Sequence, residues 1–373
     1  MESLEEAKEL LECGLISEEE FSWALEWFVS NCEAEDGESN EPGPSRRQPR
    51  RRAEFYGKFD LDKFTDEDVR LNFRFRREDI AVLQKTLLIP DEISIPGRGY
   101  RVQGKTALSI LLRRLAYPNR LSDLERLFGL SGPALSTICT YLTKILMDRF
   151  GHLLDSLPAY INAGKLQYFA KAIHEKGAPL ENCWGFIDGT ARQMCRPSVD
   201  QENYFSGHKR YHCLKYQGIL TPDGIIVSLK GSFPGRRHDA GIWVETRMEH
   251  TLRELCAAVG TKYVLYGDPA YPISDVLISP FVASSTAQNA AHFNEMMASV
   301  RQAVEWGFGK VTREFAFVDF SKNQKLLLQD LEGMYKLATI LTNCHSILYG
   351  SQTASYFRVH PPALQEYLQP ARR

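Results

Sequence analysis

In Trp184-Gly185-Phe186-Ile187-Asp188-Gly189-Thr190, one acidic residue follows directly after a short apolar run. Such a run is typical of a buried β-strand, where an ionised aspartate costs several kcal/mol unless a cation or hydrogen-bond donors compensate it. The same pattern recurs at Tyr263 to Asp268, and a third acid, Glu305, lies in a helical stretch further on. Two strand-end aspartates and one helical glutamate are the ligands that a pair of divalent ions about 3.5–4 Å apart requires.

Composition limits the class of protein. With 373 residues and 43% hydrophobic content, the chain can bury a substantial core as two domains or as one domain with an appended module. No apolar run of membrane-spanning length occurs, and the Glu-rich start lacks the layout of a signal peptide, so we expect a soluble intracellular protein without a membrane partner. The eight cysteines are scattered without a Cys-x-x-Cys pair, which favours free thiols over disulfides or a zinc ribbon.

The charge is unevenly distributed along the chain. The first 41 residues carry a net charge of −13 against −2 for the whole chain, so the remainder carries +11. A surplus of that size indicates a polyanionic partner, although solvated surface accounts for part of it. One hypothesis is that the acidic amino-terminal segment covers a basic groove as an internal inhibitor.

The first 53 residues separate into two segments. Residues 1–32 are predicted to form an acidic helical segment, and residues 33–53 a disordered linker rich in Glu, Ser, Gly and Pro. The linker ends in a basic cluster, Arg46-Arg47-Gln48-Pro49-Arg50-Arg51-Arg52. This cluster suits a nuclear import signal or a phosphate-contacting arm, with a plain solvated linker as the alternative. The first of these predicts a nuclear protein, with a cytoplasmic pool left open.

Residues 54–165 are predicted to form an all-helical domain, because Leu, Ile and Phe recur at three- and four-residue spacings. Within it, Ser122 to Phe128, a glycine turn and Pro133 to Leu142 form a candidate helix-turn-helix. The second helix has no Arg or Asn, so base-specific readout is not expected. Its polar side chains are Ser136, Thr137, Thr140 and Lys144. A helical bundle that packs on the catalytic domain is the alternative.

Short β-rich segments begin at Cys183. Tyr211 to Leu220 and Ile225 to Lys230 are joined by a Pro-Asp-Gly turn, which predicts a hairpin, and an amphipathic stretch from Ala240 to Val259 precedes the Asp268 strand. Three antiparallel strands, a helix, a further strand and later helices match the order of a ribonuclease-H-like domain. The expected fold class is therefore α/β, with a mixed sheet flanked by helices over residues 166–350, the helical domain before it and a C-terminal tail at 351–373.

Three blocks of sequence carry a family resemblance. They are Phe186-Ile187-Asp188-Gly189-Thr190, Tyr266-Gly267-Asp268-Pro269-Ala270-Tyr271-Pro272 and Arg301-Gln302-Ala303-Val304-Glu305-Trp306-Gly307-Phe308-Gly309. Together with the segment between the first two, they resemble the PIF/Harbinger-type DDE transposases and the nucleases derived from them. The resemblance runs from about Leu108 to Tyr349. It implies the ribonuclease-H-like fold, cleavage and strand transfer of DNA, and a separate Myb-like DNA-binding partner; a homo-oligomer is a further candidate partner.

The chemistry follows from the three acids. In this hypothesis Asp188 bridges two Mg²⁺ or Mn²⁺ ions, Asp268 binds one and Glu305 the other, and no side-chain base is required. Glu305 lies beside the apolar stripe of its helix, and Arg301 shares its side one turn earlier. The alternative for these two residues is a surface ion pair with no catalytic role.

Other polar residues surround this proposed centre in the sequence. Asp239, after His238, either assists a ligand from outside the metal site or caps the helix that follows. A set of basic residues is expected to contact DNA phosphates. The set comprises Lys209, Arg210, Lys215, Arg236 and Arg237, with Lys144 on the helical domain.

The sequence therefore predicts a Mg²⁺-dependent DNA endonuclease or transposase of DDE type. One alternative is a domesticated adaptor that binds DNA or chromatin without cleaving it. Loss of one of the acids would mark that class, and all three are retained. A ribonuclease shares the same chemistry and is distinguished only by its substrate.

Overall fold

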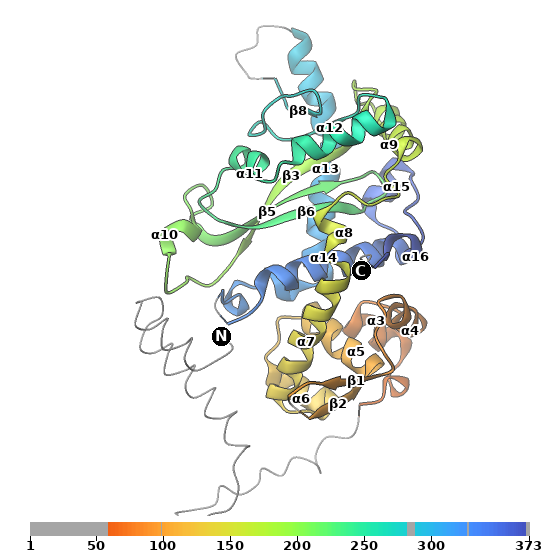
Figure 1. Ribbon diagram of the computed structural model, residues 1–373, viewed down its shortest axis with the longest axis vertical. Helices are drawn as coiled ribbons and strands as arrows, with labels where there is room; N and C mark the ends of the chain where they lie inside the picture. Colours follow the sequence, from red (N-terminus) through yellow and green to blue (C-terminus); the bar gives the residue numbers. More distant parts are fainter. Residues whose placement is uncertain (1–58, 98, 282–287, 327, 371–373) are drawn as a thin grey trace, which may run out of the picture.

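The structure is a computed structural model that describes residues 59–97, 99–281, 288–326 and 328–370. The chain forms a helical part and an α/β part that pack against each other (Figure 1). The predicted acidic segment at 1–32 and the linker with its basic cluster at 33–53 lie outside the described residues. Within those residues, no helix combines the length and apolar character needed to cross a membrane.

The helical part begins at residue 61. Its elements are η1 (Leu61–Lys63), α3 (Asp66–Phe73), α4 (Arg77–Thr86), β1 (Glu92–Ile95), β2 (Tyr100–Gln103), α5 (Gly104–Ala116), α6 (Leu121–Phe128), α7 (Gly132–Phe150) and α8 (His152–Asp155), whereas the next helix, α9 (Ala163–Glu175), lies in the α/β part (Figure 1). Thr65 starts α3 because its hydroxyl accepts a hydrogen bond from the Asp68 amide at 3.1 Å. The antiparallel hairpin of β1 and β2 interrupts a region that was predicted to be all helical.

Helices α6 and α7 occupy the region of the candidate helix-turn-helix. Gly129 ends α6 in the left-handed conformation, with φ of 66°, which a glycine adopts without steric cost. The Glu125 carboxylate accepts a hydrogen bond from the Gly132 amide at the start of α7. Helix α7 continues to Phe150, well beyond the predicted end at Leu142. A DNA-binding role for this pair stays a prediction.

The α/β part contains one mixed six-stranded sheet. Its strands are β3 (Cys183–Gln193), β4 (Phe205–Ser206), β5 (Tyr211–Leu220), β6 (Ile226–Pro234), β7 (Val264–Tyr266) and β8 (Leu277–Ile278). They lie in the order β4-β5-β3-β7-β8, with β6 paired to β5. Strand β5 runs antiparallel to β3 and β6, whereas β7 runs parallel to β3 and β8. The α/β class and the mixed sheet are confirmed; however, Asp188 lies within β3 and not at its end.

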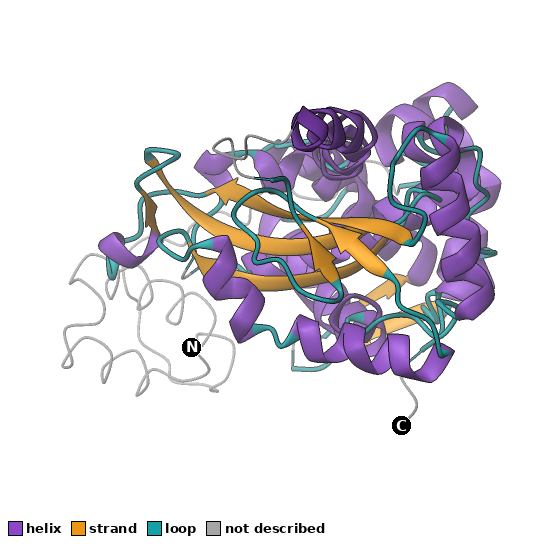
Figure 2. Ribbon diagram, turned by 90° about the horizontal axis from the view of Figure 1, so that it is seen from above, coloured by secondary structure: helices purple, strands orange, loops and turns teal. Residues whose placement is uncertain are grey.

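Helices cover both faces of this sheet (Figure 2). Successive residues of a strand point to opposite faces. A Cβ on Gly189 would face Asp239 at the start of α11 (Asp239–Glu245), whereas one on Gly218, the partner of Asp188, would face Phe308 of α13 (Gln288–Glu314). Helices α11 and α13 therefore lie on opposite faces. The remaining elements of this part are α10 (Gln201–Tyr204), α12 (Met248–Val259), η2 (Ala316–Asp319), η3 (Ser321–Asn323), α14 (Leu331–Tyr349), α15 (Gln352–Phe357) and α16 (Leu364–Tyr367).

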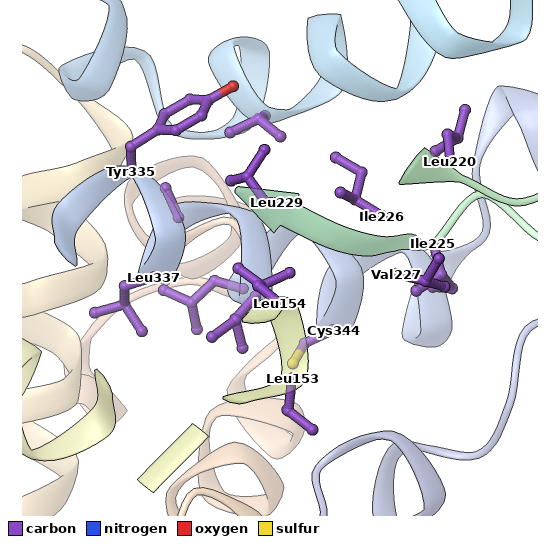
Figure 3. Close-up of a cluster of buried hydrophobic side chains, with 14 of the residues drawn as sticks. Leu153, Leu154, Leu220, Ile225, Ile226, Val227, Leu229, Tyr335, Leu337 and Cys344 are labelled. Atoms are coloured by element: carbon purple, nitrogen blue, oxygen red, sulfur yellow. The ribbon is translucent and has the colours of Figure 1, made fainter. Parts of the chain in front are cut away.

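A buried cluster around β6 joins the two parts of the chain (Figure 3). Leu153 and Leu154 of α8 pack beside β6 together with Leu337 and Cys344 of α14. The helices after residue 350 also contribute to the core, because the ring of Phe357 stacks on Phe186 with centroids 6.0 Å apart. The segment predicted as a C-terminal tail therefore packs onto the domain as far as residue 370.

Helix α13 lies very close to the sheet. An ideal Cβ on Gly307 would be 2.6 Å from the Leu220 side chain, and one on Gly218 would be 2.7 Å from Phe308. Leu220 is fully buried and Phe308 nearly so, and neither can move away freely. The two glycines therefore set the separation between helix and sheet.

We predict that Gly307→Ala destabilises the protein through overpacking, while Gly309→Ala on the same helix, where nothing lies within 4 Å of the new Cβ, does not. Overpacking costs about 1–3 kcal/mol, and Ala gains up to about 1 kcal/mol over Gly in a helix. Urea unfolding should therefore separate the two variants by about 2 kcal/mol. Equal stabilities would show that α13 is not held by close contact.

Candidate active site

Asp188 is the most constrained acid of the candidate site. Its Oδ1 accepts a hydrogen bond from the Gly189 amide at 2.9 Å, and its Oδ2 lies 3.0 Å from Nη2 of Arg301 on α13. The side chain is only 17% exposed. Burial raises the pKa of Asp188 to about 6; Arg301 lowers it, whereas Asp268 and Asp239 raise it further. Asp188 therefore lies near two other carboxylates.

Asp268 comes from the neighbouring strand. Strand β7 pairs with β3 as far as Tyr266 opposite Phe186, and it ends there while β3 continues for seven residues. Asp268, two residues past that end, therefore falls beside Asp188 where β3 has no partner on this side. Its Oδ1 accepts a hydrogen bond from the Ala270 amide at 3.0 Å, which fixes the turn.

Asp239 approaches from the other face of the sheet. A Cβ on Gly189 would lie 3.1 Å from the Asp239 carboxylate carbon, so a larger residue would push this carboxylate away. The carboxylate pairs with Nζ of Lys215 at 3.5 Å. Asp239 does not cap α11, because His238 occupies the cap position and no side-chain cap hydrogen bond forms. His238 itself is exposed.

Glu305 lies apart from these aspartates. It is exposed on α13, one turn after Arg301. Arg301 turns to Asp188 and forms no ion pair with Glu305, so the predicted alternative of a surface pair does not form. Within the ranges that the structure describes, no three His, Cys, Asp or Glu side chains converge closely enough to ligate a metal. The structure thus brings Asp188 and Asp268 together and does not bring the Glu305 carboxylate to them.

The donor chemistry nevertheless fits a divalent cation. Carboxylate oxygens are hard ligands that select Mg²⁺ or Mn²⁺. Burial is the main cause of the raised pKa of Asp188, and the ion pair with Arg301 offsets it only in part. The Arg301 guanidinium is itself incompletely paired, because its Nε is buried without a hydrogen-bond acceptor. Asp188 and Asp268 are the residues best placed to hold a cation.

Two polar residues of the site were not predicted. Tyr271 is buried and its hydroxyl accepts a hydrogen bond from the Gln217 amide at 3.3 Å. Burial, followed by Asp239 and then by Asp188 and Asp268, raises the pKa of Tyr271 well above its ordinary value. The phenol therefore lies among all three aspartates in its neutral form. Gln217, a polar residue inside an apolar strand, was the one signal in the sequence.

The predicted phosphate-binding residues fall into two places. Lys215 donates a hydrogen bond to the Arg237 carbonyl at 2.6 Å, and the Arg237 side chain pairs with Glu245 at 3.3 Å. Lys209 and Lys215 both lower the pKa of Cys213, which burial raises, so both lysines lie near that thiol. The exposed members on this side are Lys209, Arg210, Arg236 and Arg237. Lys144 is exposed on α7 of the helical part and does not belong to this group.

The sequence around this site is similar to known proteins. Residues 187–343, which include Asp188, Asp268 and Glu305, match the family described as DDE superfamily endonuclease. The chain is also similar to a protein from Arabidopsis thaliana named "Protein ALP1-like", with 22% identity over 253 residues, 65% of this chain. The aligned region spans 59% of that relative's length. No solved structure matches significantly.

We predict that Asp188→Asn stabilises the protein above pH 6. The pKa of Asp188 is raised from 3.8 to about 6, so its ionised form opposes folding above pH 6, and this cost disappears as the pH falls from 6 to below 4. The gain should be about 1–3 kcal/mol at pH 8, measured by urea unfolding in the presence of a chelator.

The matched control is Asp275→Asn, because Asp275 is about half exposed and pairs with the half-exposed Arg253. This change should alter stability by less than about 0.5 kcal/mol at either pH. A stability gain in Asp188→Asn that is the same at pH 4 and pH 8 would contradict the assigned cause.

Proposed function

We propose that this protein is a DDE-type DNA endonuclease or transposase that cleaves phosphodiester bonds with Asp188, Asp268 and Glu305. The observation that carries the proposal is the parallel pairing of β7 with β3, which sets Asp268 beside the buried Asp188. Helix α13 carries Glu305 across the same face of the sheet. The family match covers all three acids.

Proteins of this superfamily generally use divalent metals. We infer two Mg²⁺ or Mn²⁺ ions as cofactors, held by Asp188, Asp268 and Glu305. When bound, such ions lower the pKa of a bound water and neutralise charge on the phosphate oxygens. The protein's own contribution is to keep Asp188 in place through the Gly189 amide and Arg301. Lys215 holds Asp239 beside Asp188 in the same way, which supports a positioning role for Asp239.

DNA is the proposed substrate. Basic side chains next to Asp239 are suited to holding phosphates on either side of the bond to be cut. Phe205 is exposed beside this group and contacts the His212 ring, with centroids 5.3 Å apart. A basic surface with an exposed aromatic ring is typical of nucleic-acid contacts. A nuclear location, a Myb-like DNA-binding partner and a homo-oligomer remain parts of the proposal.

We predict that duplex DNA is cleaved in the presence of Mg²⁺ and not in its absence. Asp188→Asn, Asp268→Asn and Glu305→Gln should each lower the rate by at least about a hundredfold, because each removes a ligand charge that acts jointly with the others. Asp239→Asn should lower the rate by about ten- to a hundredfold, as expected for a residue that orients a ligand. The measurement is single-turnover cleavage of labelled DNA, with Mn²⁺ binding by calorimetry as a second readout.

Glu295→Gln is the matched control, because Glu295 is exposed on the same helix as Glu305. It should leave cleavage unchanged. Full activity in Glu305→Gln together with an inactive Asp239→Asn would assign the third acid to Asp239. Tight DNA binding without cleavage would support the adaptor, and cleavage of RNA alone would support the ribonuclease.

A further inference from the structure

A surface hollow lies between α3, α5 and α6, in the helical part of the chain. It has a volume of about 320 Å³ and is lined by Asn72, Arg113, Asp123, Leu124, Arg126 and Leu127. None of these residues takes part in the site built around Asp188. Two of the six are arginines, which are the side chains best suited to bind phosphate groups.

Among the described residues Arg113 forms no salt bridge, although Asp123 lies close enough to raise its pKa. Its guanidinium carbon lies 4.3 Å from the centre of the Tyr117 ring, and that of Arg74 lies 4.5 Å from the same centre. Burial and the nearby Arg74 both lower the pKa of Arg113. Arg74 donates hydrogen bonds to the Leu71 and Glu314 carbonyls, whereas Nε and Nη1 of Arg113 are buried without an acceptor. These two nitrogens are enclosed by protein, so an oxyanion in the hollow would meet the positive charge of the guanidinium that Tyr117 holds in place and not these two donors.

Arg126 adds a second free positive charge. It is exposed on α6, and in the part of the chain that the structure describes no carboxylate lies within 4.0 Å of its guanidinium or of that of Arg113. Asp123 also lines the hollow, but its carboxylate accepts a hydrogen bond from the Arg120 amide at 3.2 Å and so caps the start of α6. The negative charge of Asp123 only partly opposes the binding of an anion, because the hollow also carries the two positive charges of Arg113 and Arg126.

We propose that this hollow binds a phosphate group of the DNA backbone. The hollow is open and carries two arginine side chains, which suits a single phosphate, and its lining includes no aromatic ring on which a base could stack. Helix α6 is the first helix of the α6–α7 pair, and first helices of such pairs commonly cross the backbone. The inference rests on the proposed function only in taking DNA as the ligand.

The test compares the salt dependence of DNA binding in the full chain without metal. Arg113→Gln and Arg126→Gln should each weaken binding and reduce the slope of log K against log salt by about one, and the double variant by about two. Arg101→Gln is the matched control, because Arg101 is 78% exposed on β2 and lies outside the hollow. It should leave the slope unchanged.

A second variant and two further measurements separate the possible outcomes of this test. If Arg113→Gln fails to fold, the exposed Arg126→Gln still tests the hollow. Slopes equal to wild type, or a wild-type chain that does not bind DNA, would overturn the proposal. Protection from thermal unfolding by inorganic phosphate, lost in the variants while the DNA slope stays unchanged, would instead reveal a site for free phosphate. Cleavage with Mg²⁺ is measured separately, so failure of the proposed nuclease is distinguished from failure of the hollow.

Discussion

The contact of α13 with the central sheet is the constraint on which the candidate site depends. Gly218 on the strand and Gly307 on the helix leave no room for side chains between the two elements. At this separation Arg301 reaches across to Asp188 at 3.0 Å. A larger residue at either glycine would move the helix outward, and a short charge-assisted bond weakens quickly as its length grows. Backbone packing and site electrostatics are therefore set by the same two positions.

The electrostatics of the site work against stability. Asp188 is buried beside two other aspartates, and the single nearby guanidinium of Arg301 leaves the pKa of Asp188 raised. A fold selected only for stability would replace this aspartate with a neutral residue of similar size. Retention of a largely enclosed aspartate whose pKa burial raises is typical of functional sites.

Much of this arrangement could be predicted from the sequence. Strand β5 begins and ends at the predicted residues, and β3, β5, β6 and β7 follow the predicted order, because apolar runs and a Pro-Asp-Gly turn specify them locally. The position of Asp188 within β3 was missed, since the strand continues through the polar residues Thr190 and Arg192. Those residues are stabilised by tertiary contacts, such as the 2.8 Å pair of Arg192 with Asp319, that no local pattern reveals.

For the site, the local sequence predicts which residues take part but not which of them are in contact. The pattern of acidic residues identified Asp188, Asp268 and Glu305 as candidate site residues, and Arg301 belongs to the same sequence block as Glu305. This pattern could not show that Arg301 faces Asp188, because an ion pair between Arg301 and Glu305, four residues apart on a helix, fits the spacing equally well. The sequence could also not show that Asp239 lies over Gly189, because these two residues are far apart along the chain and meet only in the folded protein. Contacts between distant segments depend on the sheet register, which the sequence specifies only through the completed fold.

The relation between Arg301 and Glu305 gives the site two ways to balance its charge. The two residues lie one helical turn apart, about 6 Å along α13. Folding requires that buried Asp188 be compensated, and Arg301 supplies that charge from the protein itself. A cation held by Asp188 would compete with Arg301 for the same carboxylate, and Glu305 would then contribute negative charge where Arg301 contributed positive charge. Glu305 is exposed and can turn without disturbing the core, whereas Arg301 is largely buried. One helical turn therefore carries both the group that stabilises the fold and the group expected to complete the active site.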